Sequence, residues 1–207
     1  MTRRLLDCGD SAVLVDCADL ADALGLKARL EQQPMACVSE IVPGAQTLLL
    51  RLSAALTSTE RERLLSASAP AGGPTRGEPV TIEVTYDGED LAEVAELTGR
   101  SEDEVVATHT GQLWTVGFCG FAPGFGYLHG EDDRLRVPRR SSPRTRVPAG
   151  SVGLADHWSG IYPRSGPGGW QLIGHTERAL WDLDRDPPAL LQPGMQVRFL
   201  VAGPAGG

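Results

Sequence analysis

Three segments between Trp114 and Trp170 decide the fold class: Gly117–Leu128 (GFCGFAPGFGYL), Val147–Leu154 (VPAGSVGL) and Ile161–Trp170 (IYPRSGPGGW). Glycine permits positive φ and close backbone approach, whereas proline fixes φ and removes a hydrogen-bond donor. With the interspersed aromatic, valine and leucine residues, this composition predicts short strands joined by shaped loops. Loops on a rigid sheet often bind ligands, although the same glycines can simply turn the corners of a barrel.

A run of arginines without an acid separates the first two segments. Its members are Arg134, Arg136, Arg139, Arg140, Arg144 and Arg146. The segment Glu78–Glu104 is the acidic counterpart, because it holds ten acids and one base. This asymmetry predicts a local anion site or a patch that faces a partner. A solvated surface whose charges pair with one another is the alternative.

Composition argues against a nucleic-acid-binding, membrane-spanning or secreted protein. The 207 residues carry a net charge of −8, which argues against nucleic acid as a partner. No apolar run approaches the ~18 residues of a membrane helix. Asp7 and Asp10 interrupt the N-terminal stretch, so no signal peptide is expected. We therefore expect a soluble, cytoplasmic protein without a membrane partner.

Metal and nucleophile motifs are missing from the sequence. The cysteines Cys8, Cys17, Cys37 and Cys119 show no C-x-x-C spacing, and the four histidines lack zinc-site spacing. We expect reduced thiols and no metal. No serine lies in G-x-S-x-G, so the catalytic residues stay unassigned.

Lys27 is the only lysine in the chain. A phosphate-binding loop needs a lysine in G-x-x-x-x-G-K, and the residues around Lys27 do not match. A biotin-bearing lysine would have to be this residue too. If ATP or biotin takes part in the reaction, we expect another subunit to bind it.

The chain divides at the linker Pro70–Pro79, which is rich in glycine and proline. Residues 1–76 are expected to form a small α+β (ferredoxin-like) domain, and residues 77–207 a mainly β barrel domain. In the first domain we expect strands at 4–7, 12–15, 38–42 and 47–52, and helices at 19–33 and from Thr57 or Ser58. In the second we expect a strand at 80–86, a helix from Asp90 to Gly99, a helix opened by the capping box Ser101–Glu104, and then short strands.

Several side chains could form a binding site. Arginine offers a fork of donors to carboxylate or phosphate, which makes Arg139, Arg140, Arg144 and Arg164 anion-binding candidates. The aromatic residues Phe118, Phe121, Phe125, Tyr127 and Trp170 could wall a pocket or simply fill the core. For His109 a packed core position is favoured over a ligand role. The residues alone thus indicate a β-rich domain with an anion pocket.

The same motifs resemble the family of the B subunit of 5-oxoprolinase, also called allophanate hydrolase subunit 1 or KipI. The matching motifs are GF-x-G-F-x-PGF-x-YL from Gly117, PR-x-x-x-PR-x-x-VPAGSV from Pro138 with slightly altered spacing, GIYP from Gly160, PGGW-x-LIG-x-T from Pro167, EIVP from Glu40 and LQPGMQVRF from Leu191. The resemblance covers nearly the whole chain, and the combination of motifs is highly specific.

The resemblance implies a cyclophilin-like barrel after the α+β domain, and a complex with a homologue of the C subunit (allophanate hydrolase subunit 2-like) and with the A subunit. The implied activity is a hydrolase reaction, the ATP-dependent opening of 5-oxoproline, a small amide, to glutamate. ATP would be bound mainly on another subunit, and this chain alone would be inactive. The alternatives are a urea carboxyltransferase or allophanate hydrolase subunit with a biotin-carrying partner, and a non-catalytic KipI-like inhibitor of a histidine kinase.

The motifs and the chemistry above give a set of candidates for binding substrate or an anion. They are His109, Phe121, Pro123, Gly124, Phe125, Tyr127, Arg139, Arg144, Pro148, Gly150, Ser151, Tyr162, Gly168, Gly169 and Trp170. The chain departs from the usual family pattern at Glu131, Asp156, Trp158 and His175.

Overall fold

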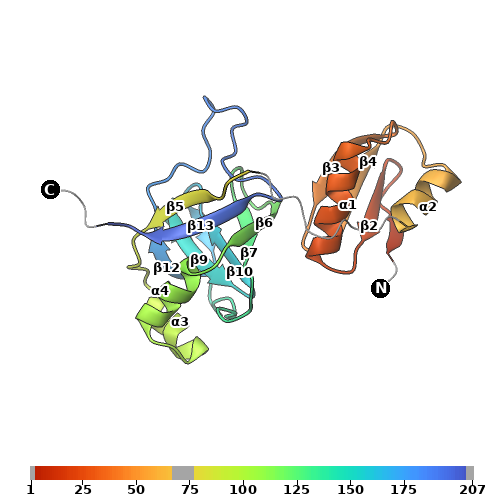
Figure 1. Cartoon of the computed structure of the whole chain (residues 1–207). Coiled ribbons are helices and arrows are strands. Elements are labelled where there is room, and N and C mark those ends of the chain that lie inside the picture. Colours follow the sequence, from red (N-terminus) through yellow and green to blue (C-terminus); the bar gives the residue numbers. More distant parts are fainter. Residues whose placement is uncertain (1–2, 67–76, 204–207) are drawn as a thin grey trace. The chain divides into compact units, whose positions relative to one another are not determined.

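The structure, a computed structural model, describes residues 3–66 and 77–203. The chain forms two compact units, residues 1–76 and residues 77–207, and the second is called the barrel unit below (Figure 1). Most of the expected linker Pro70–Pro79 lies outside the described residues. No helix in the described ranges is long and apolar enough to cross a membrane.

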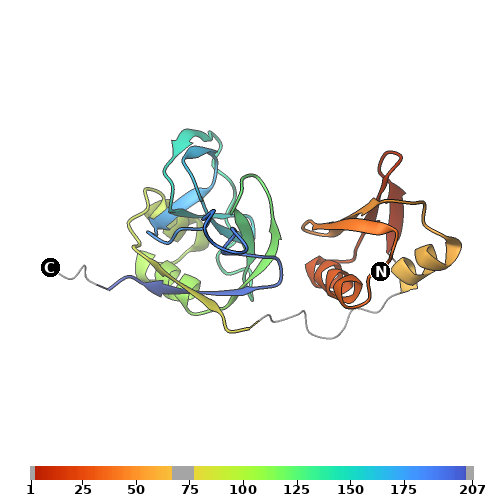
Figure 2. The ribbon, with the colours of Figure 1, turned by 90° about the horizontal axis from the view of Figure 1, so that it is seen from above.

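The first unit is an antiparallel sheet with helices packed on it. Its elements are β1 (Arg4–Asp7), β2 (Ala12–Asp16), α1 (Leu20–Gln32), β3 (Val38–Pro43), β4 (Thr47–Leu52) and α2 (Ser58–Ser66). The strand order is β1-β2-β4-β3, and α1 packs against β3 and β4 (Figure 2). Alternating residues of β2 and β4, such as Val15 and Leu48, enter the core because side chains of a strand alternate between its faces. Asp19 caps α1 by accepting a hydrogen bond from the backbone N–H of Asp22.

The barrel unit consists of short strands and a pair of helices. Its elements are β5 (Val80–Val84), α3 (Leu91–Thr98), α4 (Glu102–Thr110), β6 (Trp114–Cys119), β7 (Gly126–His129), β8 (Arg144–Val147), β9 (Ser151–Ala155), β10 (Trp158–Ile161), β11 (Gly166–Gly168), β12 (Gln171–His175) and β13 (Gln196–Val201). The predicted mainly β, barrel-like architecture is therefore observed. The capping box of Ser101 and Glu104 opens α4 as expected.

One pair of residues closes the main sheet of the barrel unit. The strand order β12-β9-β10-β7-β6-β13-β5 leaves β12 and β5 at the two edges. The backbone N–H of Thr85 donates to the carbonyl of His175 at 2.8 Å, and the N–H of His175 donates back to Thr85 at 2.8 Å. Closure removes much of the exposed edge that open sheets leave. Apolar side chains such as Trp114, Val116 and Phe199 fill the core of this unit.

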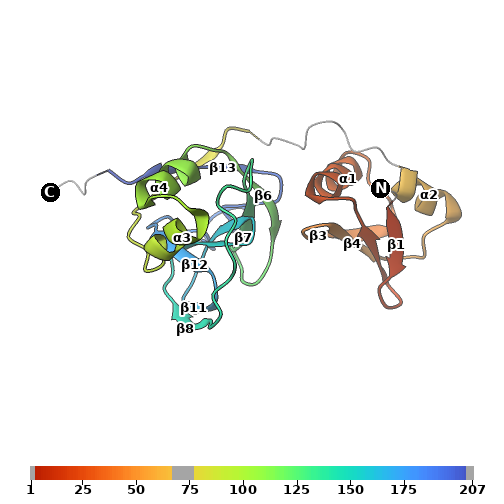
Figure 3. The ribbon, with the colours of Figure 1, turned by 90° about the horizontal axis from the view of Figure 1, so that it is seen from below.

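Two features flank the closed sheet and position the loops described next. The helix α3 packs on β12 and α4 packs on β13. The short strands β8 and β11 pair with each other in a separate antiparallel sheet (Figure 3). The arginine loop, residues 134–143, leads into β8, and β11 leads through Gly169 and Trp170 into β12. The fold thereby brings the arginine loop and the third glycine-rich segment together.

Candidate functional site: an aromatic pocket beside the arginine loop

A small cavity of about 60 Å³ lies where the glycine-rich segments meet the arginine loop. Eight residues line this aromatic pocket: Phe121, Phe125, Tyr127, Arg139, Tyr162, Gly168, Gly169 and Trp170. All eight are among the residues that the sequence singles out. They come from the β6–β7 loop, β7, the arginine loop, the residue after β10, the end of β11 and the β11–β12 connection.

Phe125 is the centre of the aromatic packing. Its ring makes edge-to-face contacts with Tyr127, Tyr162 and Trp170 at centroid distances of 5.1, 5.4 and 5.3 Å. This arrangement is the one that aromatic quadrupoles prefer. Phe125 is buried, whereas Phe121 at the rim is 60% exposed and holds a positive φ of 67°. A bulky residue in that backbone conformation is uncommon and marks a shaped, candidate functional position.

Gly168 keeps the pocket open beside Tyr162. A Cβ at Gly168 would lie 2.3 Å from the Tyr162 hydroxyl oxygen, so any side chain there would displace the phenol. Burial raises the pKa of Tyr162, while the positive charge of Arg139 acts in the opposite direction. The Tyr162 hydroxyl is therefore protonated near neutral pH and can donate a hydrogen bond.

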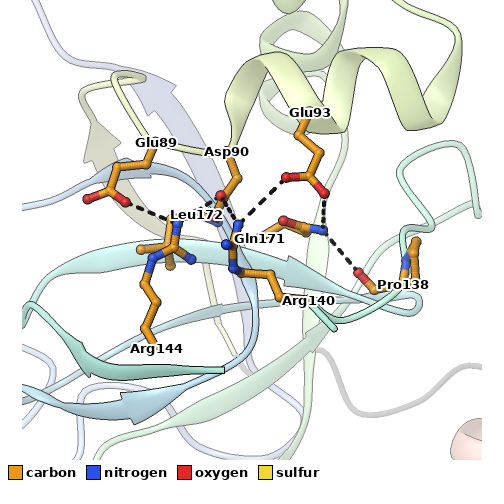
Figure 4. A network of polar contacts seen from close by, with 8 residues as sticks. All are labelled: Glu89, Asp90, Glu93, Pro138, Arg140, Arg144, Gln171 and Leu172. Atoms are coloured by element: carbon orange, nitrogen blue, oxygen red, sulfur yellow. Dashed lines mark hydrogen bonds and ion pairs between the residues drawn. The ribbon is translucent and has the colours of Figure 1, made fainter. Parts of the chain in front are cut away.

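The arginines of the arginine run differ in their partners. Arg140 Nη1 and Arg144 Nη2 both donate to Asp90 Oδ1, at 2.5 and 2.8 Å, and Asp90 is buried. The other oxygen of Asp90 accepts from the backbone N–H of Leu172 at 2.7 Å. We call this group of four residues the Asp90 clamp. Figure 4 shows Asp90 between the two arginines, with Glu89 next to Arg144 and Glu93 next to Arg140.

The clamp fixes the charge state of its members. Burial alone would raise the pKa of Asp90, but the hydrogen bonds from Arg144 and Leu172 and the charges of both arginines hold the pKa below its usual range. The hydrogen bond to Asp90 raises the pKa of Arg144 in turn. The clamp is thus fully ionised at neutral pH and ties the start of α3, β12 and the arginine loop together.

The sequence predicts that Arg144 binds an anion together with Arg139, and the structure places it elsewhere. Arg144 does not line the pocket, because Glu89 and Asp90 of the acidic segment take up its guanidinium. The arginine and acidic segments therefore neutralise each other in part. Arg139 differs: no carboxylate of the described residues lies within ion-pair distance of it, and it faces the pocket.

The remaining candidates shape the site rather than line it. Pro123 and Gly124 belong to the β6–β7 turn, and Pro148 belongs to the β8–β9 turn. The Gly150 N–H donates to the Tyr162 carbonyl at 2.7 Å, and the Tyr162 N–H donates to the Ser151 carbonyl at 2.9 Å. These backbone bonds hold Tyr162 at the pocket.

His109 lies in the core of the barrel unit and not at the pocket. Its side chain is fully buried, with Nδ1 at 2.7 Å from the Tyr86 hydroxyl and Nε2 at 2.9 Å from the Ser159 hydroxyl. The ring also stacks on Phe199 at 4.3 Å. Burial lowers the pKa of His109 to about 3. The structure agrees with the packed core position that the sequence favours.

We expect the free energy of unfolding of the barrel unit to fall as pH drops below about 6.5, the pKa of a histidine in an unfolded chain. The unfolded state takes up a proton on His109 there, whereas the folded state stays neutral down to a pKa of about 3. One such proton changes stability by about 1.4 kcal/mol per pH unit. Urea unfolding of His109→Gln should show a flatter dependence between about pH 6 and 4. An unchanged slope in His109→Gln would contradict this account.

A larger open hollow of about 440 Å³ lies elsewhere on the barrel unit. Its lining residues are Thr81, Glu83, Thr85, His175, Thr176, Glu177, Arg178 and Ala202. None of them is a predicted binding residue, and no phenylalanine, tyrosine or tryptophan is among them. Among the described residues, no group of three or more His, Cys, Asp and Glu side chains could hold a metal ion. The aromatic pocket is therefore the stronger candidate, although it is smaller.

Sequence reasoning misses the role of Asp90. The sequence marks it only as the start of a helix, and it does precede α3, but its side chain makes no capping hydrogen bond and instead binds the arginines. The available signal is the opposite charge of the acidic segment and the arginine run. That signal identifies the two segments but not the residue.

Comparison with known proteins places the chain in a family. The sequence profile described as "Carboxyltransferase domain, subdomain C and D" matches residues 3–191. The chain is 45% identical over 170 residues to a protein of Escherichia coli O157:H7 named as the B subunit of 5-oxoprolinase, covering 79% of this chain and 78% of that protein.

Solved structures show the same fold. The chain is similar to the crystal structure of TTHA0988, with a TM-score of 0.75 and 38% identity, over 100% of this chain and 42% of that one. It thus spans about two-fifths of the length of TTHA0988. The urea carboxylase of Kluyveromyces lactis has a TM-score of 0.70 at 17% identity, over 97% of this chain and 22% of the enzyme, which shows the fold alone. The resemblance drawn from the motifs is confirmed: the chain belongs to the carboxyltransferase domain family, subdomain C and D, and is a relative of proteins named as the B subunit of 5-oxoprolinase.

Proposed function

We propose that this chain is the B subunit of an ATP-dependent 5-oxoprolinase, a hydrolase complex that opens 5-oxoproline to glutamate. The observation that supports this most is the 45% identity to a protein named as the B subunit of 5-oxoprolinase over 79% of the chain. The aromatic pocket can receive one group of a small amide substrate, because Arg139 and Tyr162 offer hydrogen-bond donors beside the aromatic rings.

The phosphate chemistry is assigned to a partner. The sole lysine, Lys27, lies on α1 and forms an ion pair with Glu31 at 2.6 Å, one helical turn away. No phosphate-binding loop surrounds it in the sequence. When bound, ATP would activate the lactam carbonyl by phosphorylating its oxygen, which makes the carbon susceptible to water. We therefore propose that the main ATP site lies on another subunit.

The proposed partners are homologues of the A and C subunits of 5-oxoprolinase. The E. coli relative is itself named as one subunit among others, which supports the existence of partners for that protein. TTHA0988 also extends well beyond the part that matches this chain. The urea carboxylase similarity is restricted to the fold, so a carboxyltransferase reaction is not proposed.

We expect the purified chain to release no glutamate from 5-oxoproline, with or without ATP, because it supplies no phosphate-binding loop. Co-expression with the A-subunit and C-subunit homologues from the same genome should give a complex that releases glutamate and phosphate when ATP is added. A coupled glutamate dehydrogenase assay measures both cases.

The variant Lys27→Ala is the matched control for this division of labour. It should assemble and turn over like the parent chain, because its ion pair with Glu31 lies within α1 and no phosphate-binding loop surrounds it in the sequence. Glutamate release by the single chain, or an inactive complete complex, would contradict the proposal.

A further inference from the structure

The size of the aromatic pocket limits what it can hold. Its volume is about 60 Å³, whereas pockets that enclose most of a small-molecule ligand usually measure about 300–1,000 Å³. The pocket therefore has room for one small group of a ligand. A complete lactam ring that carries a carboxylate is larger. The pocket can receive a substituent of such a molecule, with the ring outside near the exposed Phe121.

The charge of the pocket favours an anionic substituent. Arg139 is the only charged residue among the eight that line it. Within the described part of the chain, its neighbours Arg140 and Arg144 are neutralised by carboxylates and Arg139 is not. Tyr162 is almost fully buried and keeps its hydroxyl proton for donation. The edges of aromatic rings are electropositive as well.

The loop geometry holds Arg139 at the pocket. The backbone N–H of Arg140 donates to the carbonyl of Gly169, a lining residue, at 2.9 Å. The side chain of Arg140 is fixed by Asp90. The backbone position of Arg139 thus follows from an anchored neighbour rather than from a free loop.

We propose that the aromatic pocket is a carboxylate-binding subsite, in which Arg139 selects an acid over its neutral analogue. The identity of that acid as 5-oxoproline rests on the proposed function. The carboxylate enters between the rings and accepts hydrogen bonds from Arg139 and Tyr162. The lactam remains at the mouth of the pocket, accessible to the partner subunits. The neutral lactam 2-pyrrolidone, which has the same ring without the carboxylate, lacks the group that the subsite recognises.

Titration of the ¹⁵N-labelled full-length chain tests the subsite without any turnover. Addition of 5-oxoproline should shift the amide signals of Gly168 and Gly169 and the indole signal of Trp170, whereas 2-pyrrolidone at the same concentration should not. The variant Arg139→Gln should weaken the binding of 5-oxoproline about tenfold or more, because it removes a charged hydrogen bond. The variant Arg136→Gln is the matched control, since Arg136 is exposed, belongs to the same arginine run and does not line the pocket.

The outcomes separate this inference from the proposed function. Equal responses to both lactams, no response to either, or an unchanged affinity in Arg139→Gln would overturn the carboxylate subsite. A similar loss in Arg136→Gln would overturn it too, because the effect would then be one of general charge. If binding depends on Arg139 but the complete complex releases no glutamate, the proposed function is refuted. The carboxylate subsite then still stands. The variant Arg139→Lys, which keeps the charge but not the fork, should bind with intermediate affinity.

Discussion

Asp90→Asn is expected to lower the free energy of unfolding of the barrel unit by about 3 kcal/mol or more. The substitution keeps the size of the side chain but removes the charge that faces Arg140 and Arg144. Asp90 is 3% exposed at its side chain, and the side chains of its two partners are 28% and 17% exposed. Two guanidinium groups would therefore be left largely buried near each other without their shared carboxylate. Removing one partner of a buried ion pair is costly for this reason.

Tryptophan fluorescence during urea unfolding measures this effect in the right part of the chain. All four tryptophans, Trp114, Trp158, Trp170 and Trp181, belong to residues 77–207. The matched control is Glu89→Gln, because Glu89 contacts the same Arg144 but its side chain is 76% exposed. The control should lose less than about 1 kcal/mol, as exposed ion pairs usually do. Similar losses in the two variants would show that burial of Asp90 does not set its contribution.

The same carboxylate also gives the clamp a pH dependence. Its folded pKa is held below the usual value, whereas an aspartate in the unfolded chain titrates near pH 3.9. The stabilisation is therefore fully present above that pH and is lost as pH falls through the folded pKa. Above about pH 4 the contribution of Asp90 stays constant while that of His109 changes, so the His109 contribution can be measured by itself there.

Local elements of this fold could be predicted because their signals are local. The capping box at Ser101 and Glu104 opens α4, and Gly99 ends α3 in the left-handed conformation that suits glycine. The pocket residues could also be singled out, since dense glycine and aromatic motifs mark shaped loops. Eight of them do converge on one cavity. Sequence patterns thus identify which residues to consider before any geometry is known.

Long-range pairing could not be predicted in this way. The strand β5 pairs in parallel with β13, from the other end of the barrel unit, and the Thr85–His175 bridge closes the sheet. Neither pairing leaves a mark in local composition, because a strand's pattern shows which face is buried but not which strand lies beside it. The pairing of Arg144 with Asp90 could not be predicted for a similar reason, because the two residues are 54 positions apart. Charge patterning indicates the two segments and cannot choose between an external anion and an internal acid.

Gly174→Ala is expected to lower the free energy of unfolding of the barrel unit by about 2–3 kcal/mol, because the barrel closes at this glycine. A Cβ at Gly174 would lie 2.3 Å from the carbonyl oxygen of Thr85 and 3.0 Å from Cγ1 of Val84. The Thr85 oxygen is backbone and is itself the acceptor of the closing hydrogen bond from His175. A methyl group must therefore push β12 away from the end of β5. Gly174 also lies at an irregularity in the pairing of β12 with β9, where a strand has little freedom to adjust.

The control for this prediction is Gly166→Ala in β11, where no atom lies within 4 Å of the added Cβ and φ is not positive. Gly166→Ala should unfold at nearly the parental urea concentration.

Amide hydrogen exchange gives a second, local measurement. The N–H groups of Thr85 and His175 should be protected in the parent and in Gly166→Ala, and should exchange quickly in Gly174→Ala. If Gly174→Ala keeps both the parental stability and the protection of these amides, the bridge is not what closes the barrel. Loss of protection with little loss of stability would instead show that the sheet tolerates an open edge. In that case the Asp90 clamp holds β12 in place through Leu172. The geometry of the adjoining aromatic pocket then depends on the clamp as well.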